Sequence, residues 1–244
     1  MINQDRKHLI IIGAQRSGST YLRSLLDQHP EIFMSRPAKP EPKYFLRDEP
    51  NLIEYINTVF KEAPRSTSYL GEKSTSYYET PEVSRRIQKI LPQAHIIAIL
   101  RNPTDRALSN YNFTYESGLE TRSVEEVFLS NLPQPKAPGT ISVNPFNYLE
   151  RSNYQNLLSP FKETFGDKFH VILMEELVAG NLESLFAFLS LDTPTNIDRK
   201  RLRTNSIESL PVPDNVLRYL NSYFAPRIDS LETYLELDLS IWKA

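Results

Sequence analysis

The sequence predicts an α/β fold, a central parallel β-sheet flanked by helices, and two observations support this. Short apolar runs rich in Ile and Leu alternate along the chain with segments whose apolar residues recur at helical spacing. Two of these runs end at a polar junction that opens a helix. Such alternation is typical of parallel sheets, which bind ligands at the carboxyl ends of their strands. The length of 244 residues fits a single domain, which we expect to span residues 1–244.

The first junction predicts a phosphate-binding loop. The apolar run Leu9–Ile12 stops at Gly13, and a polar loop then leads into a helical pattern that begins near Tyr21. Gly13 and Gly18 enclose four residues, so the backbone can turn tightly and direct several N–H groups at one point. The positive end of the following helix adds to this potential. The sequence therefore predicts a P-loop-like, phosphate-binding loop after the first strand.

The other elements follow in order along the chain. Residues 35–50 are dense in Pro and cannot form a regular helix or a central strand, and residues 191–213 form a basic, loop-like segment. We expect further strands at residues 31–34, 69–72, 95–100 and 169–174. We expect further helices at residues 52–60, 81–91, 123–130, 148–165, 175–189 and 214–223, and one that starts at residue 103.

A second strand-to-helix junction predicts a second anion site. Arg101 follows an apolar run, Asn102 can cap the next helix, and Pro103 and Asp105 suit its first and third positions. Arg101 and Ser109, about two turns into that helix, could both address an anion. One ligand with two phosphate-bearing ends would then explain both junctions. The alternative is that Arg101 pairs with an acid and Ser109 is a surface hydroxyl.

The first loop lacks the features of a nucleotide triphosphatase. In the pattern G-x-x-x-x-G-K-[ST] the Lys reaches the outer phosphates, whereas Ser19 stands at that position here. The apolar run HIIAIL ends in Arg101, where a magnesium-binding acid would be expected. These departures argue against ATP or GTP hydrolysis and leave a phosphate cradle with Arg16 as its cation. A plain turn that binds nothing is the alternative for this loop.

Composition excludes several classes of protein. The formal net charge of −2 argues against binding to nucleic acid by bulk electrostatics. The absence of cysteine excludes disulfides, thiolate metal sites and a cysteine nucleophile. The longest apolar runs are far shorter than the ~20 residues that a membrane span needs. No signal peptide precedes them, so we expect a cytoplasmic protein.

Motifs along nearly the whole chain resemble one enzyme family. The chain resembles the sulfotransferases that use 3′-phosphoadenosine 5′-phosphosulfate (PAPS), and more closely the branch with heparan-sulfate-type and many bacterial enzymes. The resemblance is carried, in this order, by GAQRSGSTYL, LLDQHPEI, PEPKYF, GEKSTSYY, ILRNPTDRALSNY, RSNYQNLL, VILMEEL and YFAPRIDSLETYLELDLSIW. It implies PAPS as co-substrate and no metal. It also implies that the 5′-phosphosulfate is bound by the first loop and the 3′-phosphate by the second junction: Arg16, Ser17, Gly18, Ser19 and Thr20, then Arg101 and Ser109.

Three residues are candidates for catalysis. Sulfuryl transfer needs a base for the acceptor proton and cations for the oxygens of the donor. The four histidines occupy positions that indicate structural roles, so a carboxylate is the better base. The resemblance implies Glu41 as that base, Lys73 near the reacting centre, and Arg16 in place of a Lys that neutralises the leaving phosphate. The alternatives are a solvated acid at Glu41 and a surface Lys at Lys73.

The sequence departs from the family at two places and leaves the acceptor open. Lys43 stands where the family often has a His, and residues 205–207 stand where the heparan-sulfate enzymes have Lys-Gly-Arg. A small molecule or a carbohydrate, with a hydroxyl or an amine, remains possible as acceptor, and the oligomeric state is open. Five tyrosines near the motifs either line an acceptor cleft or are ordinary core and surface residues: Tyr44, Tyr77, Tyr78, Tyr111 and Tyr115.

The sequence also allows two other functions. One is a nucleotide kinase or other phosphoryl transferase, which magnesium-dependent activity would support. The other is a non-catalytic module that binds 3′-phosphoadenosine nucleotides, which tight binding without turnover would support.

Overall fold

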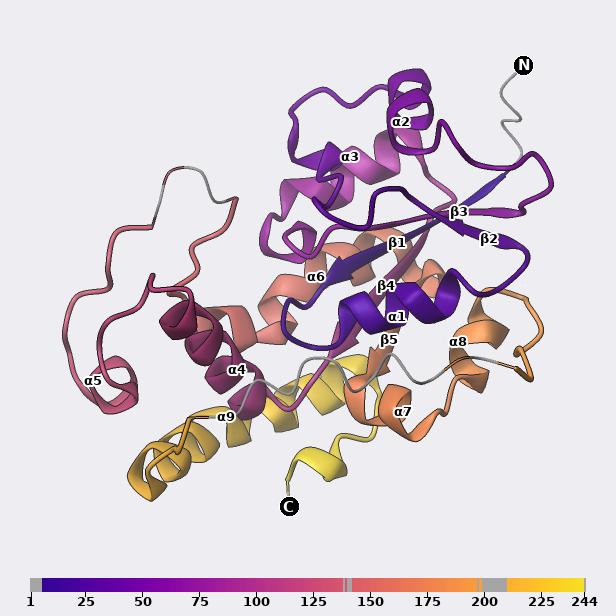
Figure 1. The fold of residues 1–244 in the computed structure, drawn as a ribbon. Helices are drawn as coiled ribbons and strands as arrows, with labels where there is room; N and C mark the ends of the chain where they lie inside the picture. The colour runs from indigo at the N-terminus through magenta and orange to yellow at the C-terminus, as the bar shows by residue number, and fades with distance from the viewer. Residues whose placement is uncertain (1–5, 138, 140–141, 197, 199–209, 244) are drawn as a thin grey trace. The chain divides into compact units, whose positions relative to one another are not determined.

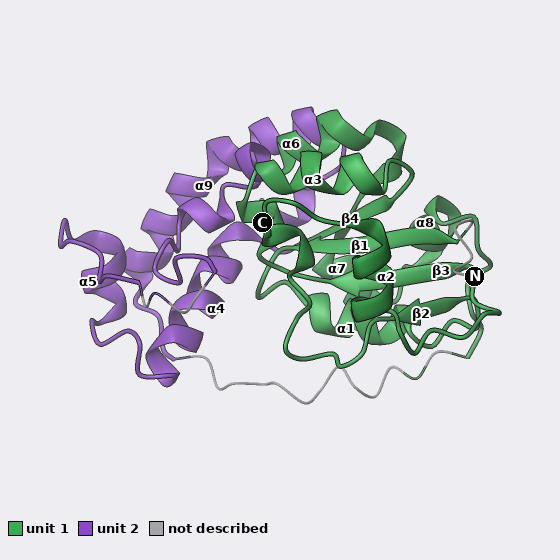
Figure 2. Cartoon of the chain, turned by 90° about the horizontal axis from the view of Figure 1, so that it is seen from above, with its two compact units in different colours: residues 1–100, 158–205 green, residues 101–157, 206–244 purple. Residues whose placement is uncertain are grey.

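The computed structural model describes residues 6–137, 139, 142–196, 198 and 210–243 (Figure 1). The chain divides into two compact units (Figure 2). Unit 1 consists of residues 1–100 and 158–205, and unit 2 of residues 101–157 and 206–244. The expectation of one domain over residues 1–244 stays a prediction.

Unit 1 contains a five-stranded sheet in which every pairing is parallel. The strands are β1 (Lys7–Gly13), β2 (Ile32–Met34), β3 (Tyr69–Lys73), β4 (His95–Leu100) and β5 (Phe169–Leu173), in the order β2-β3-β1-β4-β5. The chain builds β2 and β3 on one side of β1 and then β4 and β5 on the other. The carboxyl end of β1 is therefore a topological switch point, where open α/β sheets bind ligands. The predicted α/β fold with a central parallel sheet is confirmed.

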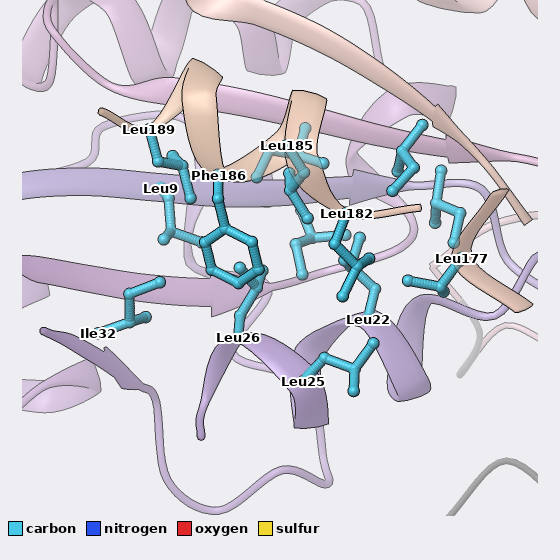
Figure 3. Close-up of a cluster of buried hydrophobic side chains, with 14 of the residues drawn as sticks. Leu9, Leu22, Leu25, Leu26, Ile32, Leu177, Leu182, Leu185, Phe186 and Leu189 are labelled. Carbon is cyan, nitrogen blue, oxygen red and sulfur yellow. The ribbon is translucent and has the colours of Figure 1, made fainter. Parts of the chain in front are cut away.

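Helices cover both faces of this sheet. Figure 1 shows α2 (Leu52–Val59) and α3 (Glu82–Ile90) on one side and α1 (Ser19–Leu26), α7 (Met174–Ala179) and α8 (Glu183–Phe188) on the other. Leucines of α1 and α8 pack on alternate residues of the strands in the hydrophobic cluster of Figure 3. All four residues from Leu9 to Ile12 have no exposed surface. Burial on both faces explains why this strand is a continuous apolar run and does not alternate with polar residues.

Three predicted helices are wrong in extent, and two of them contain a break in the structure. The helix expected at residues 175–189 is divided into α7 and α8, because Gly180 adopts a left-handed φ of 85° that ends α7. The helix expected at residues 148–165 begins only at Tyr154, as α6 (Tyr154–Phe165), and a short 3-10 turn, η3 (Glu150–Ser152), precedes it. In both cases the apolar spacing continues across the break, so periodicity alone does not reveal it.

Unit 2 is helical and contains α4 (Pro103–Glu116), α5 (Val124–Leu129) and α9 (Asp214–Leu235). The helix predicted at residues 214–223 is much too short, because α9 continues through Pro226. Asn102 caps α4 as predicted: its side-chain oxygen accepts the N–H groups of Thr104 and Asp105. Other 3-10 turns in the two units are η1 (Tyr44–Leu46), η2 (Tyr77–Glu79), η4 (Gly166–Lys168) and η6 (Ser240–Trp242).

Part of the sequence-based interpretation lies outside the described residues. This applies to residues 205–207 and to the basic side chains of the segment 191–213, namely Arg199, Lys200, Arg201 and Arg203. Within the described part of the chain, no helix is both long enough and apolar enough to cross a bilayer.

Candidate active site

The loop after β1 has the features of an anion cradle. Its first peptide is tied to the neighbouring strand, since the Ala14 N–H donates to the Ile99 carbonyl at 2.8 Å. Gly18 precedes α1 with a left-handed φ of 87°, which glycine adopts without steric cost. Ser17 is fully buried, and its hydroxyl has no hydrogen-bond partner among the described residues. The first turn of α1 carries no acidic side chain. An anion at this helix N-terminus would therefore meet donors without a competing carboxylate from that turn.

The remaining loop residues differ in exposure. Arg16 is half-buried and also has a left-handed backbone, with φ of 71°. Ser19 is buried at the start of α1, and Thr20 is exposed. The loop predicted from the sequence therefore exists as strand, loop and helix, while its contacts with a phosphosulfate group stay a prediction.

The segment that follows β3 packs directly against this loop. A Cβ atom at Gly13 would overlap the Tyr78 ring, so only glycine permits this close approach. The Ser74 N–H also donates to the Ile11 carbonyl at 3.0 Å, which extends the contact between β3 and β1. The residues after β3 thus lie beside the phosphate-binding loop at the same edge of the sheet.

Glu41 and Lys73 form a half-enclosed ion pair at this edge. The Lys73 Nζ atom lies 2.5 Å from Glu41 Oε1, and the two side chains are 5% and 16% exposed for Lys73 and Glu41. The Thr75 N–H donates to Glu41 Oε2 at 2.9 Å, and the Thr75 hydroxyl lies 3.1 Å from both carboxylate oxygens. Glu41 is therefore not a freely solvated acid, and Lys73 is not a surface lysine.

The Pro-rich loop that carries Glu41 is attached to the same segment by its backbone. The Lys43 N–H donates to the Ser74 hydroxyl at 2.9 Å, and the Phe45 N–H donates to the Tyr77 hydroxyl at 3.0 Å. Lys43 is exposed and has a left-handed φ of 50°. Together with the Thr75 bonds to the Glu41 carboxylate, these two backbone bonds fix the position of Glu41 relative to Lys73.

Arg101 and Ser109 belong to unit 2. Arg101 follows β4 immediately, and its guanidinium lies 3.5 Å from the Asp105 carboxylate one helical turn later. Both partners are partly exposed, at 27% for Arg101 and 55% for Asp105, so this pairing contributes little stability. Ser109 is half-buried on α4. Both residues occupy the predicted junction, and their binding of a 3′-phosphate stays a prediction.

The predicted catalytic residues are therefore only partly brought together. The structure joins Glu41 to Lys73 and places them beside the loop that contains Arg16. Sequence analysis missed Thr75, which binds both oxygens of Glu41. In the sequence, Thr75 is recognisable as a hydroxyl residue two positions after Lys73, in a polar stretch that follows a strand.

Most of the tyrosines near the motifs are core residues. Tyr44, Tyr77, Tyr78 and Tyr111 are each less than 5% exposed, whereas Tyr115 is 42% exposed. The first four are therefore buried side chains, and whether any of the five tyrosines lines an acceptor cleft stays a prediction. In unit 2, Tyr111 and Tyr115 line a pocket of about 200 Å³ together with Asn112, Ser123, Val124, Leu210, Pro211 and Val212.

Curated proteins with similar sequences are sulfotransferases. The bifunctional heparan sulfate N-deacetylase/N-sulfotransferase 1 of Caenorhabditis briggsae is 33% identical over 110 residues. The human bifunctional heparan sulfate N-deacetylase/N-sulfotransferase 2 is 36% identical over 109 residues. These alignments cover 44% and 42% of the chain but only 13% and 12% of the relatives. Mouse heparan sulfate glucosamine 3-O-sulfotransferase 5 is 29% identical over 202 residues, which cover 81% of the chain and 56% of that enzyme.

A solved structure has the same fold over almost the entire chain. The sulfotransferase from Alicyclobacillus acidocaldarius aligns with a TM-score of 0.75 and 26% sequence identity, covering 98% of this chain and 99% of that one. The family model of the sulfotransferase domain matches residues 6–166, which include the phosphate-binding loop, Glu41, Lys73 and the second junction. The chain therefore belongs to the sulfotransferase family.

Proposed function

We propose that this sulfotransferase transfers a sulfuryl group from PAPS to a hydroxyl or an amine, with Glu41 as the general base. The observation that carries this proposal is the fixed Glu41–Lys73 pair, held by Thr75 beside the phosphate-binding loop. A base must be held within reach of the proton that it accepts, and burial of the pair keeps it in one place.

The chemistry assigns a distinct role to each residue. The acceptor oxygen or nitrogen forms a bond to sulfur, its proton passes to a Glu41 carboxylate oxygen, and the bond from sulfur to the bridging phosphate oxygen breaks. The Lys73 ammonium, next to Glu41, stabilises charge on the transferring group. The Arg16 guanidinium neutralises charge on the leaving phosphate, and its planar fork can donate two hydrogen bonds. We propose no metal in this reaction.

Donor binding is supported by groups on the loop. The buried Ser17 hydroxyl lacks a partner in the described structure, and the N-terminal end of α1 carries no acid in its first turn. We propose that these groups, with Arg16, Gly18, Ser19 and Thr20, bind the 5′-phosphosulfate. Arg101 and Ser109 are proposed to bind the 3′-phosphate.

Carbohydrates are the first acceptor class to test. The relatives are named for N-sulfation of heparan sulfate and for 3-O-sulfation of its glucosamine, so both an amine and a hydroxyl on one kind of sugar are represented. We therefore propose a glucosamine-containing saccharide as acceptor. A cytoplasmic location, expected from the sequence, remains a proposal.

The substitution Glu41→Gln tests the base. It removes the proton acceptor and keeps the size of the side chain, so transfer is expected to fall by about 10²–10⁴-fold. Binding of 3′-phosphoadenosine 5′-phosphate (PAP) should stay within about twofold of the parent. Transfer is measured with ³⁵S-labelled PAPS and a panel of glucosamine saccharides, and binding by calorimetry.

Glu49→Gln is the matched control, because Glu49 is an exposed acid in the same Pro-rich segment. This control should keep full activity. If Glu41→Gln transfers sulfate as fast as the parent and the control, the base assignment is wrong.

A further inference from the structure

Glu72 is a buried acid for which the proposed reaction has no use. It lies on β3 immediately before Lys73, and because side chains alternate along a strand the two point to opposite faces of the sheet. Glu72 has no exposed surface, and it is in register with the buried Ile10 of β1. Neither of its carboxyl oxygens has a well-formed hydrogen bond to a described residue, and an interaction with the Tyr77 hydroxyl favours its charged form. A buried carboxylate without well-formed hydrogen bonds is strongly disfavoured in its charged form.

Two buried phenols and one carboxylate lie close enough to Glu72 to influence its charge. Tyr55 comes from α2, Tyr77 from η2 and Glu41 from the Pro-rich loop. Burial raises the pKa of Glu72 to about 8, the Tyr77 hydroxyl acts in the opposite direction, and the nearby charge of Glu41 raises it again. Glu72 is therefore mostly a neutral carboxylic acid at pH 7. Two further titratable side chains face Tyr55: Tyr44 of η1 at 5.0 Å and His8 of β1 at 5.8 Å between ring centroids.

The same two phenols support the loop that carries Glu41. The Tyr77 hydroxyl accepts the Phe45 N–H at 3.0 Å. The Phe45 ring packs on Tyr55 and Tyr77, with centroids 4.9 Å and 5.8 Å apart. Phe45 is four residues after Glu41, so whatever disturbs these rings also disturbs the base. A charge on Glu72 would draw water or a counter-ion into this cluster.

We propose that Glu72 is a positioning residue for Glu41: its buried carboxyl group supports the Tyr55–Tyr77–Phe45 cluster that holds the loop. Ionisation of Glu72 would loosen the loop. The kinetic part of this inference rests on the proposed role of Glu41, whereas the anchoring of the loop does not. Glu72 touches no reacting atom and acts only through the cluster.

Hydrogen exchange of the Lys43 and Phe45 amides measures the anchoring without any catalysis. When the loop opens, Glu72 meets water and its pKa returns toward 4.5, so the open form binds fewer protons between pH 4.5 and 8. Closing therefore weakens as pH rises through this range. The protection factors of both amides should fall about tenfold per pH unit between pH 5 and 8 and level off above pH 8.

Glu72→Gln replaces the neutral acid with a neutral amide. The protection of the Lys43 and Phe45 amides from exchange should then be independent of pH between pH 5 and 8. Glu72→Met, which fills similar space without an ionisable group, should have the same effect and guards against an effect peculiar to the amide. The exposed acid Glu82 gives the matched control. Glu82→Gln should keep the pH-dependent fall in amide protection that we expect for the parent. The inference is overturned if either Glu72 variant retains that fall.

Kinetics provide the second readout. Glu72→Gln should keep kcat at pH 7 within about twofold of the parent. It should also abolish the decline of kcat that we expect for the parent as pH rises toward 8. A decline of equal size in both proteins contradicts the inference. If Glu41→Gln is fully active, the proposed function fails, but the exchange experiment still decides whether Glu72 anchors the loop.

Discussion

At the scale of single residues, Glu41 is defined by the groups that hold it. A carboxylate on a Pro-rich loop would normally be mobile and solvated. Here Lys73 and Thr75 occupy both of its oxygens, and backbone bonds at Lys43 and Phe45 fix the loop on either side of Tyr44. Preorganisation of this kind lowers the entropic cost of bringing a base to its substrate.

Arg101 gives a prediction at the same scale. If it binds the 3′-phosphate, Arg101→Ala removes a charge-assisted hydrogen bond worth about 1.5–3 kcal/mol and weakens PAP binding about 10–100-fold. Calorimetry measures the Kd. Arg218→Ala, at an exposed arginine of α9 in the same unit, should leave the Kd unchanged. An unchanged Kd for Arg101→Ala would mean that this side chain serves only its pairing with Asp105.

Motifs in the sequence single out Glu41 and Lys73 as candidate site residues, but the contacts of these residues become visible only in three dimensions. Glu41 and Lys73 stand in recognisable motifs, although nothing in the sequence shows that they touch across 32 positions. Thr75 and Glu72 lie in the same GEKSTSYY motif as Lys73, but the resemblance assigns no role to either. Glu72 in particular lies in the polar string GEKSTS, which suggests an exposed strand end, yet the cluster of Tyr55 and Tyr77 buries it completely.

At the scale of elements, strands were easier to predict than helix ends. Strand β4 has the predicted bounds, because a fully buried parallel strand is an apolar run with sharp edges. Helix ends depend on the backbone of single residues. Gly180 ends α7 in a left-handed conformation, whereas Pro226 does not end α9, where buried residues continue at Ile228 and Leu231. Packing of that apolar face outweighs the hydrogen bond lost at proline.

Two histidines on the strands make stability depend on pH. His8 near the start of β1 and His170 near the start of β5 both have pKa values lowered to about 4 by burial, with Arg6 adding to the effect at His8. The unfolded chain binds their protons below pH 6.5 and the folded chain does not. The stability that these two histidines contribute is thus complete above pH 6.5 and is lost as pH falls toward 4. Each histidine should lower the free energy of unfolding by up to about 2 kcal/mol between pH 7 and pH 5.

Urea unfolding at pH 7 and pH 5 checks this pH dependence. The double variant His8→Gln/His170→Gln carries no titrating group at these positions and should lose less free energy of unfolding on acidification than the parent. Equal losses in the two proteins would show that these histidines are not the groups that bind the protons.

At the scale of the whole molecule, strand order explains why distant motifs form one site. Because β1 lies between β3 and β4, the loop after β1 and the segment after β3 emerge side by side at one edge of the sheet. The alternation of strands and helices predicts this edge, but the order of the strands cannot be derived from the alternation. The loop and the Glu41–Lys73 pair therefore lie in one unit, although about 60 residues separate the loop from Lys73 along the chain.

Transfer of label from two alternative donors distinguishes sulfuryl transfer from phosphoryl transfer. The protein is incubated with glucosamine saccharides and either ³⁵S-labelled PAPS or γ-³²P-labelled ATP, with magnesium or with a chelator. We expect ³⁵S-labelled saccharide to form at equal rates with magnesium and with chelator, and we expect no transfer of ³²P. Magnesium-dependent transfer of ³²P, or tight binding of PAP without sulfation of any acceptor in a broad panel, would contradict this expectation.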